Sequence, residues 1–433
     1  MPNNIHSLRS VLVSREQDFG LALGKVLSPS QPLQSEEFLK GREDQLAGIK
    51  RALYQHGRHV LIHGLRGVGK SSLAQTAAFQ LADGVDPVIL SCDERTTLYS
   101  IIKEVSSEIL QQKPTLRSSI AELNISFRAF GLQVGGRVQE ESGTVEESVS
   151  INEAARLLQF LAKEVGQKLV VVVDEFDQVT SKKEQQNFAN FIKHISDKHV
   201  PSSFIFCGIG ESIDRLMAAH ESADRYFHTV SLGRLPWEAR FDIVTAAAEV
   251  LGIEIDNGTI VRIARISDGF PQYVHFISEK LFWCVYRASN GGKVTADLFE
   301  KAMSDAASSM DMRLRGPYEK ATQKYKNEYE RVLWAVADGH ELQRRSIDIF
   351  DSYRRIMQAR SEAHIDRKMF NNRINSLKKS SHATILTGSR QGWYEFTEKM
   401  IRGYVRLRAE QEGVVLEHDH PSATRRYNTY EAR

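Results

Sequence analysis

The chain has 433 residues, of which 41% are hydrophobic and 26% are charged, and its formal net charge is +2. This length and composition suit two or three globular domains. The near balance of charge excludes an overall polyelectrolyte, so any surface for nucleic acid has to be a local patch. The three cysteines, Cys92, Cys207 and Cys284, form no C-x-x-C pair, and we expect them to be reduced and to bind no structural zinc.

The sequence shows no sign of membrane insertion or secretion. No apolar run approaches the roughly 18–20 residues that a membrane-spanning helix needs. Residues 1–17 lack the apolar core of a secretory signal. We therefore expect a cytoplasmic protein with no membrane partner. Residues 1–35 end in a Pro- and Ser-rich stretch at 28–32, which predicts an N-terminal extension or linker.

A glycine-rich motif follows the apolar run Val60–Ile62 and precedes a stretch of helix-forming residues. It fits G-x-x-x-x-G-K-[ST], and the residues expected to bind nucleotide are Gly64, Leu65, Arg66, Gly67, Val68, Gly69, Lys70, Ser71 and Ser72. Its glycines let backbone N–H groups approach phosphate oxygens, and the helix N-terminus adds partial positive charge. Lys70 is expected to reach the β- and γ-phosphates, and the Ser71 hydroxyl to bind Mg²⁺. The alternative is a chance glycine-rich turn, which the strand before it and the helix after it disfavour.

The next stretch alternates predicted elements with an insertion. Apolar spacing predicts a strand at 87–90 and helices at 97–111 and 151–165. Between the two helices an insertion spans about 112–150, and its alternating residues 124–139 indicate a hairpin or an extended segment. Arg128 and Arg137 make this insertion a second candidate surface for DNA or a partner.

A second motif consists of the aliphatic run Leu169–Val173 followed by Asp174 and Glu175. The run indicates a strand buried on both faces, as in a parallel sheet. Acidic residues at the carboxyl end of such a strand lie at the edge where ligands bind in open α/β sheets. Asp174 is expected to bind Mg²⁺, directly or through water, and Glu175 to polarise the attacking water. The alternative is a core strand followed by a solvated acidic turn.

The remaining patterns divide the chain into three further parts. Strands at 203–210 and 228–232 complete an alternation of strands and helices that favours a parallel α/β sheet. Helical patterns at 234–251 and 259–286 predict a small α-helical lid. From residue 318, helices at 325–337, 346–359 and 366–379 precede a hairpin at 383–396, an order typical of a winged helix. The polar tail from 411 is expected to be disordered.

With these pieces placed, residues 36–410 resemble an AAA+-type ATPase of the branch that holds the origin-recognition initiators, the archaeal ATPases and the related STAND NTPases. The resemblance implies an α/β P-loop NTPase core (36–233), a helical lid (234–317) and a C-terminal winged-helix domain (318–410). Residues 169–175 match the hydrophobic run and D-E of a Walker B motif. Residues 38–43 resemble the F-x-G-R-E box of this branch, which assigns Arg42 to the adenine. Arg225 stands where the family carries an arginine finger for ATP bound by a neighbouring subunit, so the resemblance implies a homo-oligomer; an ordinary surface arginine is the alternative.

Two departures from the initiator pattern stand out. Initiators carry a polar sensor, usually asparagine, after the strand that ends near residue 210, and here Glu211 and Ser212 occupy that place. The lid stretch 268–272 is a G-x-P pattern with Pro271 as a nucleotide contact, which is closer to the STAND and archaeal ATPases. Gln272 stands where initiators have arginine. These departures weaken the initiator assignment and leave the ATPase assignment unaffected.

Basic residues gather in the predicted winged helix. The candidates for contact with DNA or a partner are Lys368, Arg373, Lys378, Lys379 and Arg390. Such side chains can pair with phosphates and position a helix on a duplex. The alternatives are an ordinary solvated face and a protein-interaction module, since fold-level analogy is a weak warrant for function.

The sequence thus predicts an enzyme that binds and hydrolyses ATP with Mg²⁺ as an oligomerising switch, acting on double-stranded DNA or a DNA-bound complex. The alternative is a STAND-like signalling NTPase, for example in antiviral defence, that gates a separate effector protein. A nucleotide-binding scaffold without turnover is disfavoured because Glu175 is present. A small-molecule kinase is disfavoured because such enzymes rarely combine a D-E Walker B motif with a lid and a winged helix.

Overall fold

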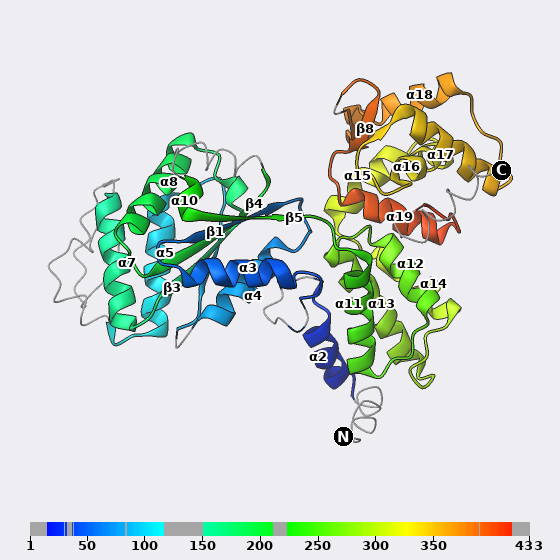
Figure 1. Ribbon diagram of the computed structural model, residues 1–433. Helices are drawn as coiled ribbons and strands as arrows, with labels where there is room; N and C mark the ends of the chain where they lie inside the picture. Colours follow the sequence, from blue (N-terminus) through cyan, green and yellow to red (C-terminus); the bar gives the residue numbers. More distant parts are fainter. Residues whose placement is uncertain are drawn as a thin grey trace, which may run out of the picture. The chain divides into compact units, whose positions relative to one another are not determined.

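The computed structural model describes residues 15–29, 31–32, 37, 39–82, 85–116, 150–210, 223–388 and 390–417. The chain divides into two compact units (Figure 1). The sheet unit comprises residues 32–65 and 69–233, and the helical unit comprises residues 1–31, 66–68 and 234–433. None of the helices in the described ranges combines the length and the apolar character that a membrane span requires.

The sheet unit is built on five parallel strands in the order β2-β3-β4-β1-β5. They are β1 (His59–Gly64), β2 (Val88–Ser91), β3 (Leu169–Asp174), β4 (Ser202–Gly208) and β5 (Phe227–Leu232). Every residue of β3 and β4 is buried, because parallel strands with helices on both faces have no solvent side. The predicted parallel sheet is confirmed. In this order β4 lies between β1 and β3, so the strands that end in the two predicted nucleotide motifs flank a single central strand.

Helices cover both faces of this sheet (Figure 1). One face packs against α3 (Glu43–Tyr54) and α4 (Lys70–Leu81); the other packs against α5 (Leu98–Gln112), α7 (Ile151–Val165) and α8 (Lys182–Asp197). Successive side chains of a strand point to opposite faces of the sheet, so each strand contributes residues to both cores. Val171 and Val173 of β3 belong to the core under α5, α7 and α8. The short helices η3 (Phe176–Gln178) and α10 (Ala223–Tyr226) also belong to this unit.

The lid helices of the helical unit are α11 (Trp237–Leu251), α12 (Asn257–Ile266), α13 (Pro271–Ala288) and α14 (Ala296–Ser308). The sequence pattern predicted one helical stretch at 259–286, and this was wrong. The stretch breaks between α12 and α13, where Asp268 and Gly269 take positive φ values of 50° and 78°. Pro271 then starts α13 at its first position, where its missing N–H costs no helical hydrogen bond.

Helix α2 (Glu16–Val26), in the predicted N-terminal extension, packs on α11 of the helical unit. Phe19 is fully buried and stacks on Tyr286 at a centroid distance of 4.3 Å, with Trp283 edge-on at 5.0 Å. The backbone N–H of Ser28 donates to Nδ1 of His275 on α13 at 3.4 Å. This segment is therefore a structural part of the helical unit.

The C-terminal part of the helical unit, residues 312–417, combines helices with a small antiparallel sheet. Its elements are α15 (Met312–Thr322), α16 (Lys326–Ala337), β6 (Arg344–Arg345), α17 (Ser346–Ala359), α18 (Arg367–Ser376), η4 (Ser380–His382), β7 (Leu386–Thr387), β8 (Trp393–Phe396) and α19 (Ile401–Gln411). The strands pair in the order β6-β8-β7, so helices precede a hairpin, as predicted. Val414 and Leu416, which the sequence placed in a disordered tail, are buried.

Candidate nucleotide-binding site

The predicted P-loop joins the end of β1 to the start of α4. Gly64, Gly67 and Gly69 have φ values of 155°, 77° and 94°, which a side chain would strain. Lys70 begins α4, and its ammonium donates to the carbonyl oxygens of Gly64 and Leu65 at 3.2 and 3.0 Å. The strand–loop–helix context that the motif needs is therefore present, with a lysine ammonium held against the loop and a helix N-terminus behind it.

The predicted Walker B acids occupy the last position of β3 and the turn after it. Asp174 is buried, and its Oδ1 accepts the backbone N–H of Glu175 at 2.9 Å. Glu175 is exposed, and its backbone has the left-handed conformation, with φ 53°. This conformation costs about 1–3 kcal/mol in a residue with a side chain and persists only where the surrounding structure enforces it. Phe176 enforces it here: its ring is buried, edge-on to Phe188 and Phe206 at 5.2 and 5.1 Å. The turn thus sends one side chain into the core and the preceding carboxylate out.

Cys207 on β4 shows that the structure brings the two motifs together. In the register of the sheet, Val173 pairs with Phe206 and Ile62 with Cys207, so the thiol lies between the ends of β1 and β3. Burial raises the pKa of Cys207 well above its usual value; the charge of Asp174 raises it further, and that of Lys70 lowers it. The lysine and the acid of the two motifs therefore act on the same thiol, at the same edge of the sheet.

A concentration of negative charge marks this edge. Burial, and then the carboxylates of Asp174, Asp93, Asp177 and Glu175, raise the pKa of the Cys92 thiol to about 12. These four acids lie within electrostatic reach of one thiol at the carboxyl ends of β2 and β3, and among the described residues no three His, Cys, Asp or Glu side chains gather closely enough to hold a metal ion by themselves. Carboxylate and hydroxyl oxygens are the donors that Mg²⁺ takes in nucleotide sites, so Asp174 and Ser71 fit that ion. Sequence reasoning did not single out Asp93 and Asp177, although each lies within four residues of the end of a predicted strand.

Arg42 is fixed to the chain that leaves β5. Its side chain is buried, and Nη2 donates to the carbonyl oxygen of Gly233 at 2.6 Å. Burial lowers the pKa of Arg42, and neighbouring Glu43 opposes this shift. The guanidinium therefore ties the start of α3 to the end of the sheet unit, and the predicted contact with adenine stays a prediction.

The other predicted nucleotide residues are dispersed. Arg225 is exposed on α10, directly before β5, where its neighbour Tyr226 donates to Oδ1 of Asp197 at 2.8 Å. Pro271 starts α13 in the helical unit. Glu211, Ser212 and the insertion residues 117–149 lie outside the described residues. The finger, sensor and insertion roles therefore stay predictions.

The basic residues predicted to contact DNA fall into two groups. Arg373 on α18 is engaged inside the C-terminal part: it pairs with Glu328 and lies over the ring of Tyr325 at 5.2 Å. Lys368 on α18 and Lys379 after it are exposed and form no ion pair within the described ranges. Two more exposed cations, Lys378 and Arg390, lie over the rings of Tyr394 and Trp393, at 5.6 and 3.9 Å from the ring centroids. Contact of any of these residues with DNA stays a prediction.

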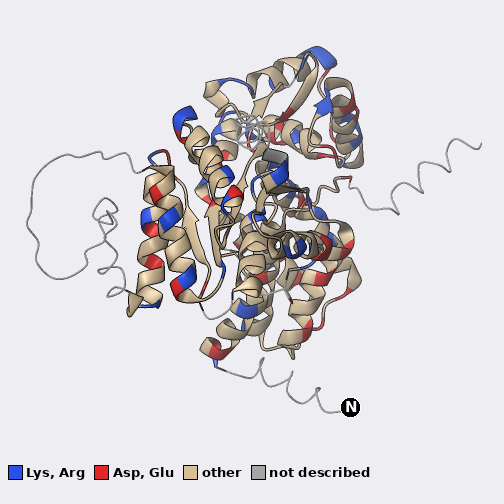
Figure 2. Ribbon diagram, turned by 60° about the vertical axis from the view of Figure 1, so that its left-hand side comes forward, with Lys and Arg blue, Asp and Glu red and all other residues tan. Residues whose placement is uncertain are grey.

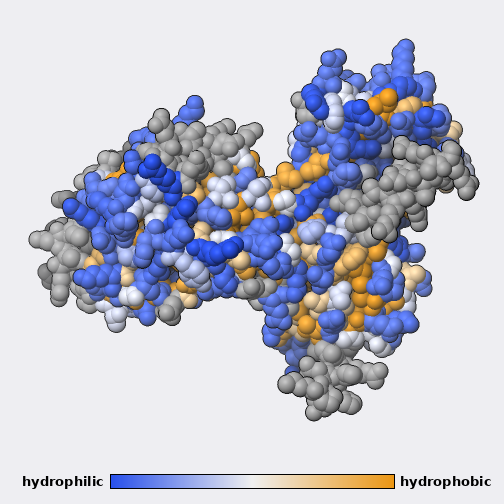
Figure 3. All heavy atoms as spheres, in the orientation of Figure 1, coloured by the Kyte–Doolittle hydropathy of each residue, from blue (hydrophilic) through white to orange (hydrophobic). Residues whose placement is uncertain are grey.

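Charged residues of both signs are mixed over the described part of the chain (Figure 2). On the face drawn in Figure 3, the C-terminal part is mostly hydrophilic, with a few apolar residues among the polar ones.

Residues 39–205 match the family model described as the AAA ATPase domain. This part of the chain is similar to an AAA ATPase domain. The P-loop and the Walker B acids described above lie within it, and the protein is accordingly an ATP-hydrolysing P-loop NTPase. No curated protein matches the chain.

Solved structures share the fold at low identity. A Walker-type ATPase of Pyrococcus abyssi is 18% identical, with 87% of this chain and 99% of that chain covered and a TM-score of 0.52. The Orc1 protein of Aeropyrum pernix, solved in complex with DNA, is 12% identical over 90% of this chain and 96% of that chain, with a TM-score of 0.45. The RuvB Holliday junction branch migration motor of Thermotoga maritima is 14% identical over 88% and 98%, with a TM-score of 0.41. The similarity to the Pyrococcus abyssi ATPase shows a shared fold. The TM-scores of the other two structures are too low to support any inference.

Proposed function

We propose that this ATPase is an oligomerising switch that acts on double-stranded DNA, or on a DNA-bound complex, through a winged helix in its C-terminal part. The observation that carries the proposal is the joint presence of two features. A P-loop follows β1 and a carboxylate edge follows β2 and β3, with β4 as the strand between β1 and β3. The C-terminal part has the helix and strand order of a winged helix, with exposed basic residues on and after α18.

The roles at the nucleotide follow from the geometry and the motif. The backbone of Gly64–Ser72 and the Lys70 ammonium would hold the phosphates of ATP, while Ser71 and Asp174 would hold Mg²⁺. Magnesium, when bound, supplies charge stabilisation for the transferred phosphoryl group. Glu175, exposed at the end of β3 on an enforced turn, would accept a hydrogen bond from the attacking water and orient it.

Glu175→Gln tests this assignment most sharply, because the chain offers a matched control two residues away. We expect E175Q to bind a fluorescent ATP analogue as the wild type does and to hydrolyse ATP about 10²- to 10⁴-fold more slowly. Asp177→Asn removes a carboxylate from the same turn and is expected to keep turnover near the wild-type rate. Wild-type turnover in E175Q, or an equal loss in both variants, would remove Glu175 from its role. Lys70→Ala should abolish analogue binding.

The proposed contact with DNA depends on which basic residues have unengaged side-chain charge. Lys368 and Lys379 are exposed, so they are suited to pair with phosphates. Asn372, on the same exposed side of α18 as Lys368 by helical spacing, is exposed too, and an asparagine amide can donate to and accept from an adenine edge. We therefore propose Lys368, Asn372 and Lys379 as the contacting set and leave out Arg373, whose charge is paired with Glu328.

A signalling NTPase of the STAND kind is the second candidate, and the turn between α12 and α13 favours it. Gly269, Pro271 and Gln272 give the G-x-P pattern without the lid arginine of initiators. In this case the nucleotide state gates a separate effector protein, and duplex DNA leaves turnover unchanged.

A further inference from the structure

Positive charges from separate segments of the C-terminal part act on one histidine. His382 is the last residue of η4, which begins after Lys379 and packs on α15. Burial lowers the pKa of His382. The charges of Lys379, Arg373 and Lys324 lower it further. Arg373 comes from α18 and Lys324 follows α15, so the fold gathers at this imidazole cations that are far apart in the sequence.

Aromatic rings hold this histidine against α16. The ring of Tyr329, a buried residue of α16, lies 4.6 Å from the imidazole of His382, measured between ring centroids. Arg373 lies over the same Tyr329 ring at 5.3 Å and over the ring of Tyr325 at 5.2 Å. Lys324 precedes Tyr325 directly. The guanidinium of Arg373 is therefore engaged between two rings, and it positions the segment that carries Lys324.

Two of the neighbouring cations are open to solvent. Lys324 and Lys379 are exposed, and neither forms an ion pair within the described ranges, whereas the nearby Lys326 lies 4.0 Å from a carboxylate of α16. The Ser381 hydroxyl lies 3.0 Å from Nδ1 of His382. Because a hydroxyl can donate to a neutral ring and accept from a protonated one, this contact suits both protonation states. We call Lys324, Lys379 and His382 the histidine cluster.

The backbone directly after His382 is strained. Ala383 and Thr384 have φ values of 57° and 48°, which are unfavourable for residues with side chains and most of all for a β-branched one. Thr397, just past β8, fixes this turn: its hydroxyl donates to the Thr384 carbonyl at 2.6 Å, and its N–H donates to the Ile385 carbonyl at 3.0 Å. Strain of this kind persists only where the fold enforces it, and it is concentrated at functional sites.

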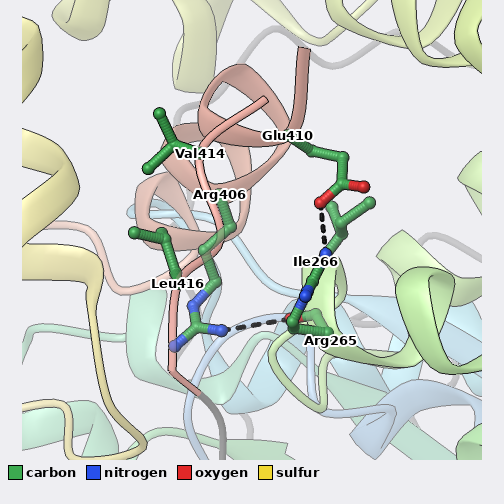
Figure 4. A pocket seen from close by; sticks show the side chains of 6 residues that line it. All are labelled: Arg265, Ile266, Arg406, Glu410, Val414 and Leu416. Atoms are coloured by element: carbon green, nitrogen blue, oxygen red, sulfur yellow. Dashed lines mark hydrogen bonds and ion pairs between the residues drawn. The ribbon is translucent and has the colours of Figure 1, made fainter. Parts of the chain in front are cut away.

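Another concentration of arginines in the helical unit is buried and balanced by acids. Arg402 pairs with Asp268 at 3.2 Å, and both side chains are buried. Figure 4 shows Arg265 lying between Glu410 and Arg406, and Arg265 pairs with Glu410 at 2.5 Å. An anion from outside cannot approach cations that are enclosed and neutralised in this way. Of the two groups, the histidine cluster is the one that a polyanion can reach.

We propose that the histidine cluster binds phosphates of double-stranded DNA and that protonation of His382 strengthens this contact, so that the protein holds DNA more tightly as the pH falls. The inference rests on the proposed contact with DNA and adds Lys324 and His382 to it. A phosphate at the cluster offsets the positive charges around the ring and therefore favours the imidazolium form.

The direction of the pH dependence follows from this charge balance. DNA phosphates stay anionic at neutral and mildly acidic pH, so the proton that is taken up on binding belongs to the histidine. The pKa of the free ring lies below its usual value of about 6.5, and bound phosphate raises it. By linkage, the affinity for DNA rises as the pH falls toward the pKa of the free ring, and the gain is complete below it.

His382→Gln removes the titrating group, and His340→Gln is its matched control, because His340 is an exposed histidine of the same part whose ring lies 4.0 Å from the carboxylate of Glu341. The full chain is measured for the Kd of a fluorescently labelled duplex at about pH 7.5 and about pH 5.5 in the same salt. Over this interval we expect the affinity of the wild type and of H340Q to rise about five- to tenfold more than that of H382Q, as a pKa shift of up to about one unit implies. Equal pH dependence in the wild type and H382Q, or an equal loss in H340Q, would overturn the proposal.

Lys324→Ala is the second variant, because removing this exposed side chain leaves the packed histidine in place. We expect K324A to weaken binding at both pH values and to reduce the slope of log affinity against log salt by about one. Lys293→Ala is its control in the lid, where Lys293 lies 3.6 Å from the carboxylate of Glu254, and it should change neither quantity. An unchanged slope in K324A would also overturn the proposal. A failure of the proposed function has a different signature, since the wild type would then bind the duplex at neither pH.

Discussion

Replacing Phe19 with alanine tests whether α2 is part of the helical unit. The Phe19 side chain is fully buried and contacts the rings of Trp283 and Tyr286. Truncating a buried phenylalanine costs about 3–5 kcal/mol, which combines lost transfer free energy with the cavity left behind. The two ring contacts place Phe19 in the upper half of that range, because each adds about 0.5–1.5 kcal/mol beyond area burial. We therefore expect F19A to lower the free energy of unfolding of the helical unit by about 4–5 kcal/mol.

Tryptophan fluorescence during urea unfolding reads this unit selectively. The four tryptophans of the chain, Trp237, Trp283, Trp334 and Trp393, all belong to the helical unit. Leu21→Ala is the control on the same helix: Leu21 is 61% exposed, so its loss is expected to change stability by less than about 0.5 kcal/mol. Equal midpoints for F19A and L21A would refute the packing of α2 and return residues 1–35 to the role of a linker.

Three further predictions concern assembly, acid and DNA. Arg225→Ala, which loses an exposed side chain before β5, should lower turnover, and mixing it with Lys70→Ala subunits should restore part of the rate; no restoration would exclude a finger that acts between subunits. His275 has its pKa lowered to about 4 by burial, so the unfolded chain binds the proton first, and stability is lost as pH falls from about 6.5 toward 4. Between pH 7 and 5 the protonation of this one group should lower the wild type's free energy of unfolding, measured with urea, by about 2 kcal/mol. His275→Gln should not show this part of the loss. Equal losses in both proteins would mean that the histidine is not buried in its neutral form. Lys379→Ala should weaken binding of a labelled duplex and reduce its salt dependence, whereas Arg373→Ala should lower the melting temperature, and the reverse pattern would refute the division of the basic residues.

The nucleotide motifs could be predicted because their signals are local. The P-loop spans consecutive residues 64–72 between a strand and a helix, and the acids at 174 and 175 follow an unbroken aliphatic run. The parallel sheet followed from the same kind of run, repeated along the chain. The break between α12 and α13 carried a visible signal in Gly269 and Pro271, but apolar spacing on both sides continued through it.

The rest depends on contacts between residues far apart in the sequence. Asp268 pairs with Arg402, which lies more than a hundred residues further along the chain. No local sequence pattern indicates that this carboxylate is buried or that an arginine is its partner. Helix α19 was not predicted, because it contains Gly403 and buries Arg402 and Arg406, so the sequence of this segment shows no continuous apolar face. Helix α2 was missed for a different reason: the Pro- and Ser-rich stretch after it suggested a linker, although Phe19, Leu23 and Val26 of this helix are buried.

The central claim is that the C-terminal part couples DNA to the ATPase site, and the steady-state rate of ATP hydrolysis with and without duplex DNA tests it most directly. The rate is measured at low and moderate salt for the wild type and for Lys379→Ala. We predict that duplex DNA stimulates the wild type, that added salt removes the stimulation because phosphate contacts release counterions, and that the variant is stimulated less. A wild-type rate that is measurable and indifferent to DNA at both salt concentrations would contradict the DNA switch and favour an ATPase that gates a protein effector.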